Sequence, residues 1–106
     1  MPLLPPQPSL ADLQKYVAEL EIERGFAQQD ALQKCLLLGE EVGELFKAVR
    51  KATRMGVDPT ASVGSLAGEL ADVLIYLCAI ANRFEVDLER AFREKEDQNG
   101  RRTWDG

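Results

Sequence analysis

The sequence has 106 residues, the size of one compact domain, of which 45% are hydrophobic and 29% charged. Its 18 acidic and 13 basic residues give a net charge of -5, which argues against a general affinity for nucleic acid. The sequence contains no histidine, which excludes the commonest general base and the histidine-carboxylate metal sites of ferritin-like bundles.

Residues 1–8 carry four prolines and are expected to form an extended N-terminal arm. They lack the basic region and continuous apolar segment of a signal peptide. No apolar run reaches the roughly 20 residues that span a bilayer. We therefore expect a cytoplasmic protein with no membrane partner, in which a single helical domain covers residues 9–104.

Four helices are predicted along the chain, and no segment shows the alternation of a strand. The first follows an N-cap at Ser9 and ends near Gly25. The second follows Asp30, which forms a capping-box pattern with Gln33, and is expected to run to Arg54.

The Gly, Asp-Pro and Ser residues of segment 55–65 predict a loop. A third helix covers about residues 65–83, and a fourth follows Asp87 and stops at Asn99-Gly100. This pattern predicts an all-α, four-helix-bundle-like fold. Cys35 and Cys78 lie in apolar helical segments, so we interpret both as reduced core thiols; a disulfide between neighbouring helices is the alternative.

Carboxylates occur within the two most apolar helices. Glu69 and Asp72 share one face of the third helix, while Glu41 and Glu44 share one line of the second, with Glu40 at its edge. Buried carboxylates cost several kcal/mol each unless Lys or Arg, proton uptake or a divalent cation compensates them. Mg²⁺, which prefers hard oxygen ligands, is one candidate. A solvated or ion-paired helix face is the other interpretation.

Two motifs carry a resemblance to a known family. The segments "GEEVGELFKAVRK" and "GELADVLIYL" resemble the signature of MazG-like all-α nucleoside triphosphate pyrophosphohydrolases, Glu-Glu-x-x-Glu followed by Glu-x-x-Asp. The segment "VDLERAFREKEDQNGRR" is similar to the closing helix of that family. The branch that includes dCTP pyrophosphatase is the most similar, although this chain has Lys51 near the place of a base-cage tryptophan and lacks a histidine near the base.

The resemblance implies a MazG fold, a homodimer or homotetramer, and Mg²⁺-dependent conversion of a (d)NTP to the (d)NMP and pyrophosphate, with Mn²⁺ as a substitute and a house-cleaning role. By the family pattern the metal ligands are Glu41, Glu44, Glu69 and Asp72. Glu40 and Glu41 are the catalytic carboxylates, Glu40 as a ligand of a second ion or as the group that orients water. The implied substrate-binding residues are Phe26, Lys47, Tyr76, Lys95, Asn99 and Arg102.

Other interpretations of the same residues stay open. Phe26 and Tyr76 also fit simple core packing, Lys47 fits a solvated position, and Lys95 and Arg102 fit a basic helix terminus. The main rival function is a non-catalytic helical interaction module in which the carboxylates pair with Lys and Arg. A helix-turn-helix DNA binder is disfavoured by the acidic charge. The long apolar helix faces are covered either by the first and fourth helices or by another copy of the chain.

Overall fold

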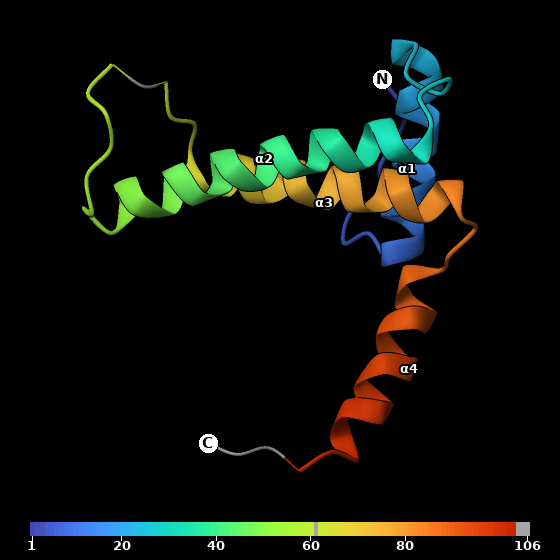
Figure 1. The fold of residues 1–106 in the computed structure, drawn as a ribbon. Helices are drawn as coiled ribbons and strands as arrows, with labels where there is room; N and C mark the ends of the chain where they lie inside the picture. Colours follow the sequence, from blue (N-terminus) through green and yellow to red (C-terminus); the bar gives the residue numbers. More distant parts are fainter. Residues whose placement is uncertain (61, 104–106) are drawn as a thin grey trace.

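The computed structural model describes residues 1–60 and 62–103, and within them the chain forms four α-helices and no strand (Figure 1). The helices are α1 (Leu10–Arg24), α2 (Ala31–Ala52), α3 (Leu66–Arg83) and α4 (Leu88–Gly100). The prediction of an all-α chain is confirmed. Residue 61 of the predicted loop and residue 104, the expected end of the domain, lie outside the described residues, and the division into an arm and one domain stays a prediction.

The helix boundaries follow from local capping chemistry. The Ser9 hydroxyl accepts a hydrogen bond from the Asp12 amide, and the Asp12 carboxylate accepts one from the Ser9 amide. Asp30 and Gln33 make the same reciprocal pair at the start of α2. Gly25 ends α1 with a φ of 79°, a left-handed conformation that glycine adopts without strain. Local sequence signals therefore account for these helix ends.

The helices α2 and α3 lie side by side and antiparallel, and α1 crosses the end of this pair where α2 begins and α3 ends (Figure 1). The buried core lies at this crossing and consists of Val17, Leu20, Cys78 and Ala79. Gln14 of α1 fastens the crossing, because its side-chain amide donates to Asn82 and to the Val86 carbonyl. Within the described residues, no helix is long and apolar enough to cross a membrane.

Helix α4 packs mainly against α1 and points away from α2 and α3 (Figure 1). The apolar face of α2 consequently stays open to solvent, with Leu32 69% and Phe46 62% exposed. The interpretation of Cys35 as a core thiol was wrong, because Cys35 lies exposed on α2. Cys78 is buried as predicted, and both thiols are free.

A buried ion network joins the first three helices. The carboxylate of Glu21 on α1 lies 3.0 Å from the Lys34 ammonium of α2, and Arg83 of α3 donates to both of its oxygens at 2.8 Å. Glu21 and Lys34 are only 5% and 4% exposed. Burial raises the pKa of Glu21, but the bonds to Arg83 and Lys34 outweigh burial and lower the pKa below its usual value. The network therefore stabilises the fold above the ordinary glutamate pKa and loses this contribution as pH falls through the depressed one.

Replacing Glu21 by Gln is expected to destabilise the protein by about 3–5 kcal/mol, because two buried cations lose their shared carboxylate. Urea denaturation at a fixed protein concentration measures the change. The matched control is Glu89→Gln, which removes an exposed pair with Arg93 at 3.7 Å and should cost about 0.5 kcal/mol or less. A loss for Glu21→Gln no larger than that of the control would contradict the structural role of the network.

Candidate metal centre and its neighbouring cavity

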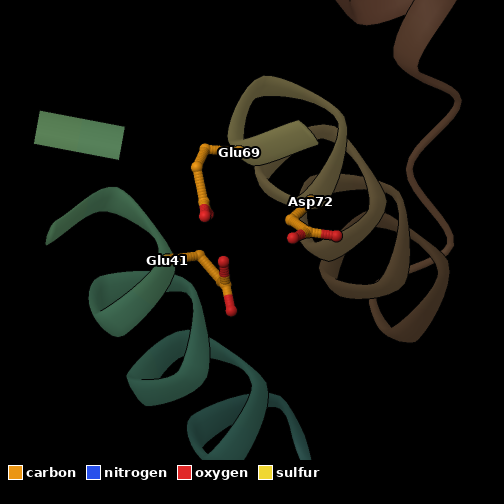
Figure 2. Close-up of side chains that lie close together, drawn as sticks. All are labelled: Glu41, Glu69 and Asp72. Carbon is orange, nitrogen blue, oxygen red and sulfur yellow. The ribbon is translucent and has the colours of Figure 1, made fainter. Parts of the chain in front are cut away.

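Three carboxylates from two helices converge where α2 lies against the start of α3 (Figure 2). Glu41 comes from α2, and Glu69 and Asp72 come from α3. One oxygen of each lies within 4.8 Å of the other two, and we call these residues the acidic cluster. Glu69 belongs to the first turn of α3, where the positive end of the helix dipole favours negative charge.

The negative charge of the acidic cluster is not balanced by a neighbouring basic side chain among the described residues. Among the described residues, no Lys or Arg pairs with Glu41, Glu69 or Asp72. Burial, the charge of Asp72 and a hydrogen bond with Glu69 raise the pKa of Glu41. One oxygen of Glu69, Oε2, is buried without a hydrogen-bond partner. An orphaned carboxylate oxygen beside a carboxyl group that resists ionisation fits a site for a divalent cation.

The other two predicted carboxylates lie beside the acidic cluster but outside it. Glu44 lies close enough for its charge to raise the pKa of Glu41, and its carboxylate lies 3.6 Å from the Lys47 ammonium. Glu40 is exposed, and its charge contributes to the raised pKa of Tyr76 after burial and the charges of Glu41 and Asp72. The structure thus brings three of the four predicted ligands together, with Glu44 one helical turn away.

A cavity of about 130 Å³ adjoins the acidic cluster and shares Asp72 with it as a lining residue. Phe26 and Tyr76, the two aromatic residues that the sequence predicts for the nucleoside, line this cavity. Lys34 also lines it, with its ammonium 5.1 Å from the ring centre of Phe26 and 5.4 Å from that of Tyr76. Sequence analysis missed Lys34, because a single lysine in an amphipathic helix gives no sign of burial.

Three of the implied substrate-binding residues, Lys95, Asn99 and Arg102, lie on α4 or just after it and do not join this site within one chain. The C-terminal half of α4 extends away from α2 and α3 (Figure 1), and Lys95 lines a different, apolar groove with residues such as Leu74 and Phe92. The Asn99 amide donates to Glu96 on the same helix at 3.3 Å. Arg102 follows α4 and is exposed.

The chain is similar to a known protein family in sequence and to a solved structure in fold. The family model described as the MazG nucleotide pyrophosphohydrolase domain matches residues 27–103. The dCTP pyrophosphatase 1 proteins of Rattus norvegicus and Homo sapiens are each 39% identical over 102 residues, which cover 92% of this chain. This chain spans about 60% of the length of those relatives. The crystal structure of iMazG from Vibrio DAT 722 matches with a TM-score of 0.67 and 37% identity, covering 87% of this chain and 98% of that one.

Gly64, in the loop before α3, leaves the space in which the Glu69 carboxylate lies, because a Cβ at position 64 would collide with that carboxylate. Its backbone is not left-handed, so alanine causes no backbone strain there. We expect Gly64→Ala to displace the Glu69 carboxylate and weaken Mn²⁺ or Mg²⁺ binding about tenfold or more, with little change in stability.

Isothermal titration with metal and a thermal melt measure the two effects separately. Gly39→Ala is the matched control, since nothing lies within 4 Å of a Cβ there, and its metal affinity should equal that of the wild type. An unchanged affinity in Gly64→Ala would contradict the placement of Glu69 among the metal ligands.

Proposed function

The chain belongs to the MazG nucleotide pyrophosphohydrolase domain family, and on that premise we propose that it hydrolyses a nucleoside triphosphate to the monophosphate and pyrophosphate. The observation that carries the proposal is the convergence of Glu41, Glu69 and Asp72 without a basic partner among the described residues. A triphosphate brings several negative charges to such a site, so the proposal requires a divalent cation. Mg²⁺ is the cation we propose, with Mn²⁺ as a substitute.

The residues present fit such a cation, because carboxylate oxygens are the ligands that Mg²⁺ prefers and Glu69 offers a buried oxygen without a partner. A bound cation supplies neutralisation of the triphosphate charge and makes a nearby water more acidic. Glu41, Glu69 and Asp72 would hold it. Glu44, which pairs with Lys47, is the proposed fourth ligand.

The exposed Glu40 and its neighbour Glu41 are the proposed catalytic carboxylates. One of them accepts the proton of the attacking water, whose oxygen bonds to phosphorus. The bond between the α- and β-phosphates breaks, and its electron pair leaves with the departing pyrophosphate. Phe26 and Tyr76 would contact the nucleoside in the adjoining cavity, and Lys47 the phosphates.

We also propose that a second copy of the chain completes the site. A groove of about 660 Å³ lies between α3 and α4, and its walls are almost entirely apolar, with Phe84 64% and Phe92 66% exposed. Together with the open face of α2, this is more apolar surface than a monomer usually exposes. A homodimer or homotetramer would cover it and could bring Lys95 and Asn99 of α4, together with Arg102 just after it, to the acidic cluster of a neighbour.

The cellular role we propose is removal of unwanted triphosphates from the nucleotide pool, since a monophosphate cannot be used for polymerisation. Two free cysteines support a reducing compartment such as the cytoplasm. The same open apolar surfaces also favour a second candidate function, a non-catalytic helical interaction module. That alternative predicts no dependence on Mg²⁺.

A panel of NTPs and dNTPs with Mg²⁺ should yield monophosphate and pyrophosphate from at least one substrate, and a chelator should stop the reaction. Metal affinity should fall as pH falls, because protonation of Glu41, whose pKa is raised in the metal-free site, removes a metal ligand. Chromatography of the nucleotide products and a pyrophosphate assay measure the outcome. Release of orthophosphate, or inactivity on the whole panel, would contradict the proposal.

In the same assay Glu41→Gln and Asp72→Asn should each lower turnover more than about a hundredfold, because each removes a metal ligand. Both variants should keep the helical circular-dichroism signal of the wild type. Glu94→Gln, which changes an exposed glutamate of α4, is the control and should retain activity.

Size-exclusion chromatography with light scattering should give a dimer or tetramer for the wild type. Phe92→Glu should shift the protein toward the monomer, because it places a charge in the apolar groove. Met55→Glu, which changes an exposed apolar residue of the loop after α2, should leave the mass unchanged. A monomeric wild type would remove the proposal of a second copy.

A further inference from the structure

Lys34 is a buried lysine whose side chain ends in the cavity beside the acidic cluster. Its ion pair with Glu21 does not use the full capacity of the ammonium group, which carries three N–H donors. Glu21 itself is already shared, since Arg83 donates to both of its oxygens. Among the described residues, Glu21 is the one oxygen partner of the Lys34 ammonium.

In the buried ion network two cations, Lys34 and Arg83, therefore share the one carboxylate of Glu21. The cavity itself is lined by Lys34 and Arg24 and by the carboxylates of Glu21 and Asp72. The rings of Phe26 and Tyr76 lie within about 6 Å of the ammonium and stabilise it through their faces, but they offer no strong hydrogen-bond acceptor. A buried ammonium with unused donors is suited to a ligand that supplies an acceptor.

The volume of the cavity suits an aromatic ring. Its volume of about 130 Å³ is close to the roughly 150 Å³ that holds a benzene ring in an engineered protein cavity. Its other walls include apolar side chains of α1 and α3, namely Val17, Leu20, Ile75 and Ala79. Asp72 belongs to both the cavity and the acidic cluster, so one ligand can place its anionic part at the cluster and its ring in the cavity.

We propose that Lys34 reads the nucleobase of the substrate by donating a hydrogen bond to a ring carbonyl oxygen in this cavity. The inference rests on the proposed nucleotide chemistry of the acidic cluster. Glu21 and Arg83 act as positioning residues. Glu21 fixes the ammonium of Lys34 through their ion pair. Arg83 donates hydrogen bonds to the backbone carbonyls of Phe26 and Gln29, and these bonds hold the loop between α1 and α2.

A hydrogen bond from Lys34 would distinguish bases that carry a ring carbonyl oxygen from bases that do not. Cytosine, uracil, thymine and guanine carry a ring carbonyl oxygen, whereas adenine carries none and presents an amino group. A site with a fixed buried donor rejects the ligand that leaves the donor unpaired. The wild-type protein should therefore prefer carbonyl-bearing nucleotides to adenine nucleotides.

Lys34→Met tests the proposal, because it removes the donor at nearly constant shape while Glu21 keeps its two bonds to Arg83. For carbonyl-bearing triphosphates we expect kcat/KM to fall about ten- to a hundredfold, mainly through KM, which is the range for a hydrogen bond to a charged group. For ATP and dATP we expect little change, so the preference collapses. Lys34→Arg, which keeps a donor, should retain part of the preference for carbonyl-bearing nucleotides. The control Lys15→Met, at an exposed lysine of α1, should match the wild type in this preference.

Equal losses for all bases in Lys34→Met, or a wild type without preference against adenine, would overturn the role of Lys34 while leaving the pyrophosphohydrolase activity in place. Binding of CMP, UMP and AMP without metal, measured by calorimetry, separates the two proposals. If the wild type cleaves no triphosphate but binds CMP and UMP better than AMP, and Lys34→Met loses that difference, the base-reading role stands and the activity fails. If no monophosphate binds and no triphosphate is cleaved, both fail.

Discussion

Repulsion between carboxylates is the local cost that the packing of α2 against α3 has to offset. Glu41 meets Glu69 and Asp72 within 4.8 Å across the most extensive helix contact of the chain, where ordinary packing would place apolar or oppositely charged groups. Apolar contacts elsewhere along α2 and α3, and the crossing by α1, must offset this local cost. A cation that binds the acidic cluster would therefore stabilise the fold as well as serve the chemistry.

Two charged groups of opposite character lie on either side of Asp72. On one side lies the acidic cluster, and on the other lies a buried ion network with more cations than carboxylates. A nucleotide has a matching division, since its phosphates recruit metal ions and its base carries neutral hydrogen-bonding groups on a flat ring. The cavity beside the acidic cluster, with Phe26 and Tyr76 in its walls, is the part of this chain that could distinguish one nucleotide from another, which family membership does not specify.

Much of the fold is local and was predictable for that reason. The capping boxes at Ser9 and Asp30 and the left-handed Gly25 involve residues at most three or four positions apart. The convergence of Glu41, Glu69 and Asp72 follows from spacing on two adjacent helices, aided by the resemblance. The buried ion network was not predictable, because its partners lie up to 62 residues apart and each alone resembles a surface charge. The direction of α4 and the exposure of Cys35 depend on which faces find a partner, and helical periodicity does not specify that.

The two cysteines differ in exposure, so a thiol reagent can label the open face of α2 selectively. Burial raises the pKa of the Cys78 thiol, which disfavours the reactive thiolate and shields it from reagents, whereas Cys35 stands on the surface beside Leu32 and Leu36. A maleimide dye or spin label would thus attach at one position of the unaltered chain. Its rate of attachment would report whether anything shields the start of α2 around Cys35 in solution.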